Sequence, residues 1–392
     1  MRIFYAAGPG DVIAAHKSWS DNRQHRDEVA LTYSGQFADF CREAGAKAYV
    51  LSSHARRETM TDGPFTLRHV PKRSGSGIGY HLGQVRHGLN VCATALRFRA
   101  SAVVVHSDTT YYFVLAPLKL FGVRVIPSLH NTLWPAGYPP AGALQRLLLK
   151  LNGLFFRRCA DAVICISPEC ARQVRQIAGR PALPIHEMRA QFAPSYFASI
   201  PPPPLHSEEP FRITFAGRME RNKGAFDVLA MAHAVDQRRP GRVRWELCGD
   251  GSEIEALKAE ADRLALGSVV TVRGWTSPLD MRAVFADSHA AIVPTRSSFP
   301  EGLAKTAAEA ILAGRPLVTC SVVPALEVLR PACIEAEADN VDSYVTAVLR
   351  LVDDAPLYER LQAACGSLQA QFYDRRNGYA AALWRAMSPL AR

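Results

Sequence analysis

The sequence predicts an α/β protein with two doubly wound domains, each built on a parallel sheet. Short β-branched runs alternate with amphipathic stretches along the chain, which is typical of βαβ units. The proline tract Pro201–Pro204 interrupts this alternation, which restarts at Phe211. The length of 392 residues is enough for two domains of ordinary size, so each run of alternation is expected to form one domain.

The first domain is expected over residues 1–200. Its expected strands are short apolar runs, and most of the later ones follow an amphipathic stretch. The strands are Met1–Ala7, Ala48–Ser52, Ala102–His106, Val123–Leu129 and Ala162–Ile166, and the helices are Val29–Glu43, Val91–Phe98 and Gly142–Arg158. Strands that are joined by crossover helices run parallel, so these elements are expected to form one sheet.

Residues 201–210 are expected to be a linker, because proline continues neither a helix nor a central strand. A second doubly wound domain is expected over residues 211–374. Residues 375–392, with a helix at Tyr379–Met387, are expected to pack back on the first domain. The strands expected in the second domain are Phe211–Phe215, Val243–Cys248, Val269–Arg273, Ala290–Pro294 and Pro316–Cys320, and its helices are Ala225–Gln237, Glu253–Leu264, Pro278–Ala286, Ala304–Ala313, Val341–Val352 and Ala355–Gln371.

The composition is that of a globular protein, with 48% hydrophobic and 21% charged residues, which excludes disordered and collagen-like chains. No apolar stretch approaches the ~20 residues of a membrane-crossing helix. Met1–Ala7 is too short for a signal peptide, so a cytoplasmic protein is expected. The nine cysteines include no C-x-x-C pair, which argues against a zinc or disulfide framework.

The net charge of +10 is concentrated in the first half of the chain. Residues 1–200 hold 24 Lys and Arg against 12 Asp and Glu, whereas residues 201–392 hold 22 against 24. The asymmetry indicates a nucleic acid, an anionic membrane surface or an anionic substrate as partner, although a solvated arginine-rich surface also explains it. The amphipathic stretch Leu144–Arg158 is expected to be either a domain-packing helix or a helix lying on an anionic membrane.

Two glutamates follow the expected strand Ala290–Pro294, at a loop and a helix start. In an open α/β sheet, ligands bind beyond the carboxyl ends of the strands, and the free N–H groups of a helix start favour phosphate. Glu301 and Glu309 are eight residues apart, about 12 Å on one helix, which suits a long ligand with hydroxyl groups at two places. The alternative is one glutamate stabilising the helix dipole and another on the surface.

A basic loop follows the first strand of the second domain. Gly217 and Gly224 permit tight turns, and Arg218 and Lys223 place two cations where a diphosphate would lie. A solvated loop explains the same residues. Gly249-Asp250-Gly251, after the next strand, is a weaker feature that turn chemistry alone explains.

In this order, the motifs resemble those of the retaining, nucleotide-sugar-dependent family 4 glycosyltransferases (glycosyltransferase group 1), which have the GT-B fold. The resemblance covers roughly residues 211–320, and elsewhere only the two-domain pattern with its linker agrees. It implies two Rossmann-like domains facing an interdomain cleft. The motifs that carry it are Gly217-Arg218…Lys223-Gly224, Gly249-Asp250-Gly251, Val272-Arg273-Gly274 and Pro294…Glu301-x7-Glu309-Ala310…Gly314-Arg315-Pro316.

The resemblance also implies roles for single residues. Arg218 and Lys223 would neutralise the diphosphate of a UDP- or GDP-sugar. Glu309 would hold the ribose hydroxyls, and Glu301 would hold those of the donor sugar. No cofactor or metal would be needed, and the chain has no Asp-x-Asp pair. The other donor-site residues would offer backbone groups or border the base: Gly217, Gly249, Gly251, Arg273, Gly274, Gly302 and Leu303.

The first half matches the family less well. His130 resembles the histidine near the transferred sugar, although a structural histidine is the alternative. On the acceptor side, the glycine loop is reduced to Gly8-Pro9-Gly10, and Arg189–Phe192 replaces the usual stretch before the linker. These departures leave the acceptor open. Ser167 resembles the family's interdomain serine, and a helix N-cap explains it equally.

The expected function is retaining transfer of a hexose to a growing glycan, with Arg218, Lys223, Glu301 and His130 as the catalytic residues. The expected acceptor is a lipid-linked precursor of a bacterial surface polysaccharide or lipopolysaccharide, which would place the enzyme on the inner face of the cytoplasmic membrane. A nucleotide-sugar epimerase, a phosphorylase on the same fold and a catalytically silent subunit are the alternatives. Nucleic acid is not an expected partner, because the sequence has no recognisable reading module.

Overall fold

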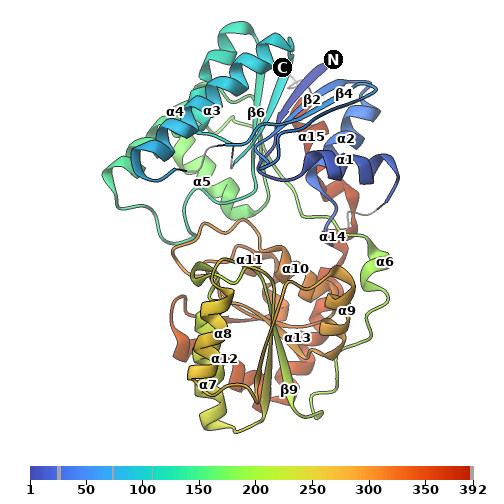
Figure 1. The fold of residues 1–392 in the computed structure, drawn as a ribbon, viewed down its shortest axis with the longest axis vertical. Helices are drawn as coiled ribbons and strands as arrows, with labels where there is room; N and C mark the ends of the chain where they lie inside the picture. The colour runs from blue at the N-terminus through green and yellow to red at the C-terminus, as the bar shows by residue number, and fades with distance from the viewer. Residues whose placement is uncertain (24–27, 73–74, 108, 389–392) are drawn as a thin grey trace. The chain divides into compact units, whose positions relative to one another are not determined.

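The computed structural model describes residues 1–23, 28–72, 75–107 and 109–388. The chain divides into two compact units, each coloured by residue number in Figure 1. Unit 1 comprises Met1–Leu133, Pro140–Gln191 and Asp374–Arg392, and unit 2 comprises Trp134–Pro139 and Phe192–Tyr373. The division therefore falls at Gln191, ahead of the linker expected at residues 201–210.

The segment before that linker groups with unit 2 because of its aromatic side chains. The ring of Phe192 lies 5.8 Å from that of Phe197 and 6.2 Å from that of Phe372. The backbone N–H of Phe192 also donates to the carbonyl oxygen of Phe372. Burial of these rings fixes the segment on unit 2.

The described part of unit 1 contains an eight-stranded sheet in the order β3-β4-β2-β1-β5-β6-β7-β8. All neighbouring strands are parallel except β3 and β4, which form an antiparallel edge. The central strands are apolar on both faces, because helices cover both. The strands are β1 (Arg2–Ala6), β2 (Lys47–Ser52), β3 (Thr59–Asp62), β4 (Phe65–His69), β5 (Ala102–His106), β6 (Arg124–Leu129), β7 (Val163–Cys165) and β8 (Ile185–Glu187).

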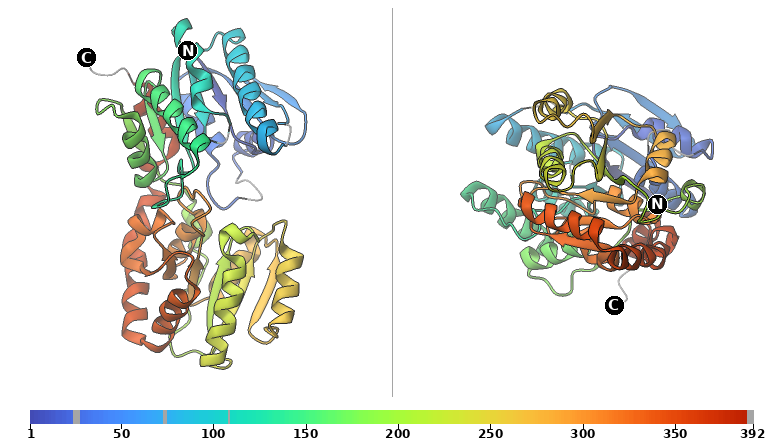
Figure 2. Two further views of the ribbon diagram at one scale, coloured as in Figure 1. Left: turned by 90° about the vertical axis from the view of Figure 1, so that its left-hand side faces the viewer. Right: turned by 90° about the horizontal axis from the view of Figure 1, so that it is seen from below.

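Helices cover this sheet on two sides (Figures 1 and 2). One side carries α1 (Val12–Ser20), α2 (Tyr33–Glu43) and α15 (Tyr379–Met387). The other side carries α3 (Gly77–Arg97), the 3-10 helix η1 (Tyr112–Phe121), α4 (Ala143–Arg158) and α5 (Pro168–Ala178), and a short 3-10 helix η4 (Arg375–Asn377) precedes α15.

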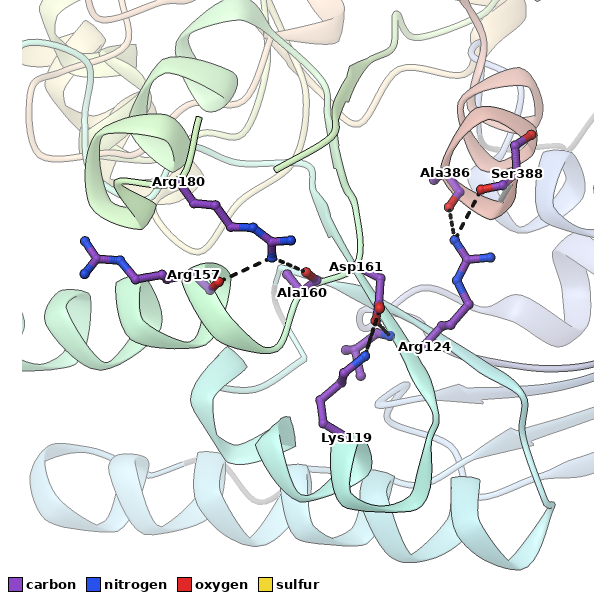
Figure 3. Close-up of polar contacts among 9 residues, drawn as sticks. Lys119, Arg124, Arg157, Ala160, Asp161, Arg180, Ala386 and Ser388 are labelled. Atoms are coloured by element: carbon purple, nitrogen blue, oxygen red, sulfur yellow. Dashed lines mark hydrogen bonds and ion pairs between the residues drawn. The ribbon is translucent and has the colours of Figure 1, made fainter. Parts of the chain in front are cut away.

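The last helix of the chain, α15, is held in unit 1 by an aromatic contact and by a cap at its C-terminus. Trp384 packs edge-on against Phe40 of α2, with 4.9 Å between the ring centroids. At the same end of the helix, the guanidinium of Arg124 donates to Met387 O at 2.7 Å and to Ala386 O at 3.0 Å. Figure 3 shows the contact with Ala386. A cation on the unpaired carbonyls of a helix C-terminus also stabilises the helix dipole.

The described part of unit 2 contains a six-stranded parallel sheet in the order β11-β10-β9-β12-β13-β14. Helices α7, α8 and α12 lie on one side of it, and α9, α10 and α13 lie on the other (Figure 1). The strands are β9 (Phe211–Ala216), β10 (Val243–Cys248), β11 (Val270–Gly274), β12 (Ala290–Val293), β13 (Leu317–Cys320) and β14 (Cys333–Ala336).

The six helices expected in unit 2 are present in the expected order, and the short helices α6, α11 and α14 were not expected. The one that matters for the site is α10, which begins at Lys305. The helices are α6 (Pro194–Phe197), the 3-10 helix η2 (Arg221–Lys223), α7 (Ala225–Arg238), α8 (Ile254–Arg263), α9 (Pro278–Asp287), α10 (Lys305–Leu312), α11 (Ala325–Leu329), the 3-10 helix η3 (Arg330–Ala332), α12 (Val341–Asp353), α13 (Ala355–Leu368) and α14 (Ala370–Tyr373).

The structure adds elements that the sequence pattern did not reveal. The edge hairpin of β3 and β4 was not expected, and α3 begins at Gly77 rather than near Val91. The early part of α3 is rich in glycine, which lowers helix propensity and hides the periodicity. At least one of these glycines is needed for packing, because a methyl group on Gly88 would lie 2.5 Å from Oγ1 of Thr110.

No helix in the described part of the chain is both long enough and apolar enough to cross a membrane.

Candidate functional site

The order of the strands in unit 2 reverses between β9 and β12. From β9 the chain moves outward to β10 and β11, returns to β12 beside β9, and then moves outward the other way. The two loops that leave β9 and β12 therefore diverge and leave a crevice at the carboxyl edge. In open α/β sheets this crevice is where ligands bind.

The loop that leaves β9 is bound to its neighbours by backbone hydrogen bonds. The N–H of Gly217 donates to Cys248 O at 3.0 Å, and the N–H of Met219 donates to Asp250 O at 2.9 Å. The N–H of Gly249 in turn donates to Gly274 O at 2.7 Å. The structure thus brings three glycine-containing loops together as one layer.

The glycines of these loops are required by close backbone approach. A methyl group on Gly249, whose φ is +139°, would collide with the carbonyl oxygen of Gly217. One on Gly251 would lie 2.6 Å from Met219 O. At Gly224, with φ of +78°, it would collide with Pro294 O. Tight loop packing thus explains the Gly-Asp-Gly motif, in addition to turn chemistry.

The crevice holds a close ion pair. Nζ of Lys223 lies 2.5 Å from Oε2 of Glu301, and Oγ1 of Thr295 donates to the same oxygen at 3.2 Å. The side chains of Lys223 and Glu301 are 17% and 10% exposed, so both charges are largely withdrawn from water. A charge-assisted contact in such a place is stronger than the same contact at the surface.

Arg218 lies beside this pair but is more open to solvent. Its guanidinium is 3.0 Å from Glu220 Oε1, and its side chain is 52% exposed. The ring of Phe299 lies under both cations, with 3.9 Å from its centroid to Lys223 Nζ and 5.3 Å to Arg218 Cζ. These cation–π contacts hold the two basic side chains at the same place.

The helix start next to the ion pair presents backbone donors. Glu301 lies in the loop before α10, and the buried N–H groups of Gly302 and Leu303 donate to no atom of the described residues. Ala304, the N-cap, has a φ of +63°, a conformation that costs free energy in a residue other than glycine. Such a helix start is suited to an anionic ligand.

A cavity of about 210 Å³ lies at the ion pair and the start of α10. The expected site residues Gly217, Arg218, Lys223 and Glu301 line it. From the sequence, no role was assigned to several other residues at the cavity or under its cations: Thr295, Phe299, Lys305 and Thr306. Thr295 and Phe299 are part of the same loop after β12, so their position directly beyond a strand was the available signal.

Seven expected donor residues do not line this cavity: Gly249, Gly251, Arg273, Gly274, Gly302, Leu303 and Glu309. Glu309 lies one turn into α10, near Tyr196. The pKa of Tyr196 is raised to about 12, mainly by burial and also by the negative charge of Glu309. The guanidinium of Arg282 lies 4.4 Å from the centroid of the Tyr196 ring. Arg273, half-exposed on β11, pairs with Glu246 of β10, and this contact raises the pKa of the Arg273 guanidinium.

His130 lies at the carboxyl end of β6 in unit 1 and is buried, with 8% exposure. Its Nε2 is 2.9 Å from Ser128 Oγ, and its backbone N–H donates to Ser107 Oγ at 3.2 Å. The ring stacks on His106, with 4.1 Å between centroids. These contacts fix the ring orientation, as both a structural and a catalytic role would need.

The loop after β1 is fixed by one serine. Oγ of Ser52 lies 3.0 Å from Gly8 O and 2.6 Å from Gly10 O. Asp11 then caps α1 by accepting from the N–H of Ala14. Elsewhere in unit 1, Ser167 caps α5 by accepting from the N–H of Cys170. This is the helix N-cap that was the alternative to a family-specific role.

Within the residues described, no three His, Cys, Asp or Glu side chains are grouped so that they could hold a metal ion.

Comparison with known families gives the identity of the fold and the activity class. Residues 210–354 match the family described as glycosyl transferases group 1, and residues 30–189 match the glycosyl transferase 4-like domain. Together the two matches span more than half of the chain. The chain is a group 1 glycosyltransferase.

Solved structures show that this glycosyltransferase has the GT-B fold, which confirms the predicted architecture. Sucrose-phosphate synthase from Thermosynechococcus elongatus aligns with a TM-score of 0.71 at 16% identity, covering 98% of each chain. The trehalose-phosphate synthase of Burkholderia xenovorans aligns with a TM-score of 0.73 at 14% identity, covering 100% of this chain and 99% of that one. Anabaena HepE, solved with UDP and glucose, aligns with a TM-score of 0.67 at 16% identity over the whole of both chains.

A comparison with curated proteins found no sequence that matches this glycosyltransferase.

Proposed function

We propose that the glycosyltransferase moves a hexose from a UDP- or GDP-sugar to a growing glycan with retention at the anomeric carbon. The observation that carries this proposal is the Lys223–Glu301 pair, which lies beside a helix start at the reversal point of the sheet. A cation and a carboxylate that line one cavity, with backbone donors at the neighbouring helix start, match the diphosphate and hydroxyl groups of a nucleotide sugar. HepE and a UDP-2-fluoroglucose complex of a trehalose-6-phosphate enzyme, both structurally similar, favour UDP.

In this proposal, Lys223 and Arg218 stabilise the negative charge that grows on the departing diphosphate. Lys223 has three N–H donors, so it can bind a phosphate oxygen and keep its contact with Glu301. Gly302 and Leu303 add backbone N–H groups from the start of α10. Because these donors are held in place before the ligand arrives, little reorganisation is needed during the reaction.

The carboxylates recognise hydroxyl groups. Glu301, oriented by Thr295 and Lys223, accepts hydrogen bonds from the donor sugar. Glu309 accepts from the ribose, and Tyr196 and Arg282 are its neighbours in unit 2. His130 acts near the transferred sugar, with its ring held by Ser128.

We also propose that the reaction needs no metal ion, since Lys223, Arg218 and the helix start supply the positive field that a metal would otherwise supply. Full activity in the presence of a chelator is the expected result.

The proposed acceptor is a lipid-linked glycan at an anionic membrane surface. The first half of α4 supports this, because Leu144 and Leu147 are 53% and 52% exposed. Arg146 and Lys150, on the same stretch, form no ion pair within the described residues. By contrast, Arg157, at the other end of α4, donates to Ala178 O. Lys119 pairs with Asp161, as Figure 3 shows. One structurally similar protein is a lipopolysaccharide outer core galactosyltransferase.

The experiment that tests the donor class is thermal stabilisation by UDP-, GDP- and ADP-sugars, because a ligand that binds the folded state raises its stability by mass action. Stabilisation by one nucleoside diphosphate sugar, followed by transfer with the anomeric configuration kept in NMR spectra of the product, is expected. Inversion, epimerisation without transfer, or no stabilisation by any nucleotide sugar would contradict the proposal.

A further inference from the structure

Unit 1 contains a second cavity, of about 870 Å³, which none of the expected site residues lines. It lies between the ends of β2 and β4 and the first part of α3. Leu51 and Arg68 line it from the strands, and Gly83 and Arg86 line it from the helix. Its volume is within the range of about 300–1,000 Å³ that small-molecule sites occupy.

The lining of this cavity is strongly basic. Arg57, Arg68, Lys72 and Arg86 contribute to it, and none of the described lining residues is acidic. The three arginines form no ion pair and no side-chain hydrogen bond with the residues that the structure describes. Some other arginines of the unit are paired, as Arg172 is with Glu169 at 2.7 Å. A group of unpaired cations around one cavity attracts an anion.

Lys72 is held in place by hydrogen bonds, and a histidine adds to the basic lining. Nζ of Lys72 donates to Gln84 Oε1 at 2.7 Å and to Thr109 O at 2.6 Å. His87 is only 7% exposed, lines the cavity and forms no hydrogen bond with the described residues. Burial, and then the charge of Lys72, lower the pKa of His87 to about 4, so its ring is neutral near pH 7 and has one N–H to donate.

We propose that this cavity binds the phosphate group of a phosphorylated ligand other than the sugar donor. One guanidinium group can bind two oxygens of a phosphate at once. The N–H of His87 and the charge of Lys72 would add to this attraction. Apart from His87, none of the described lining residues is aromatic, so nothing there would stack on a nucleotide base. Leu51, Val70 and Leu82 contact the remainder of the ligand.

This site does not depend on the proposed donor site, because the residues of the donor cavity belong to unit 2. The phosphate could come from a sugar phosphate or from a lipid phosphate. A sugar phosphate and a lipid phosphate share the phosphate group and differ in the part of the ligand that contacts the apolar lining residues. Binding of one organic phosphate of each kind therefore distinguishes the two sources.

Calorimetric titration with inorganic pyrophosphate at low salt tests the site. Arg57→Gln, Arg68→Gln and Arg86→Gln are each expected to weaken binding by at least about tenfold, since each removes a charge-assisted contact. Arg97→Gln is the matched control: it removes the same charge from the exposed last turn of α3, outside the cavity, and is expected to change affinity less than about twofold. Equal losses in all four variants would mean diffuse attraction and would overturn the proposal.

Lys223→Ala separates this site from the donor site. Pyrophosphate binding that survives in Lys223→Ala and is lost in the arginine variants supports the cavity, whereas the opposite result places the anion in unit 2 and overturns it. Because the three arginines are exposed, their variants are expected to keep the wild-type melting temperature. Glucose 6-phosphate and farnesyl phosphate then identify the source. Binding of either that depends on the three arginines supports the proposal, and binding of neither through them overturns it.

Discussion

The ammonium of Lys223 and the carboxylate of Glu301 lie 2.5 Å apart although 78 residues separate them in the chain. They meet because β9 and β12 are neighbours and both loops leave the same edge of the sheet. Replacing Lys223 by Ala would leave a largely buried carboxylate without its cation. The pair is therefore both a structural contact of the crevice and the centre of the proposed donor site.

Lys223→Ala and Arg218→Ala are expected to weaken UDP or GDP binding by roughly 10- to 100-fold, which corresponds to about 1.5–3 kcal/mol for a charge-assisted hydrogen bond. Arg221→Ala is the control, because Arg221 belongs to the same loop, is 65% exposed and pairs with Glu253 outside the cavity. Calorimetry with both nucleotides measures the effect. Unchanged affinity in both variants would refute the diphosphate role.

Glu309→Gln and Glu301→Gln are expected to differ in kind. If Glu309 binds the ribose, its variant weakens binding of every nucleotide carrying that sugar. Glu301→Gln is expected to leave nucleotide binding within about threefold and to reduce transfer and sugar discrimination by tenfold or more. Calorimetry with free nucleotide and rate measurements with two donor sugars separate the effects. The division of roles fails if both variants lose nucleotide affinity equally.

Gly249→Ala is expected to destabilise unit 2 by on the order of 2 kcal/mol or more, because the added methyl group collides with the carbonyl oxygen of Gly217 at a positive φ. Gly267→Ala, where a methyl group would meet nothing within 4 Å, is expected to change stability by less than ~0.5 kcal/mol. Urea unfolding followed by the fluorescence of the buried Trp245 reports both values. Equal midpoints for the two variants would show that the loops can separate at little cost.

The stability of unit 2 is expected to fall as the pH drops from 6.5 toward 4. Burial lowers the pKa of His289 from 6.5 to about 4, so the unfolded chain binds a proton in this window that the folded protein does not. Nδ1 of His289 accepts from the N–H of Arg212 at 3.0 Å, a contact that protonation would end. The loss at pH 4 is on the order of 3 kcal/mol. Urea unfolding at several pH values, with His289→Leu showing a shallower decline, checks it.

Pelleting with liposomes tests the membrane surface. Binding to vesicles with anionic lipid at low salt, and release at high salt, is expected, since each cation near the surface contributes about 1 kcal/mol. The double variant Arg146→Gln/Lys150→Gln is expected to bind at least tenfold more weakly. Arg350→Gln/Arg360→Gln, two exposed positions of unit 2, is the charge-matched control. Equal binding of the wild type to neutral vesicles would favour a soluble acceptor.

Much of the fold could be predicted from the sequence because burial leaves a local pattern. Strand β10 has the bounds that were expected, Val243–Cys248: its apolar residues Val243, Trp245 and Leu247 are buried and alternate with the more exposed Arg244 and Glu246. The β3–β4 hairpin could not be recognised from the sequence. Strand β3 lies at an exposed edge of the sheet, so its residues do not alternate between buried and exposed positions. The early part of α3 was hidden by glycines whose role, as at Gly88, is packing against another element.

By itself, the sequence determined the order of the elements, the basic loop with Gly217 and Gly224, the loop with Gly249 and Gly251, and the spacing of Glu301 and Glu309. All of these are properties of residues that lie near one another in the chain. Only the tertiary structure decided which of them meet. It paired Lys223 with Glu301 and turned Arg273 toward Glu246. The physical reason is that strand order sets the distances between loops far apart in the chain, and no local pattern of burial or charge records strand order.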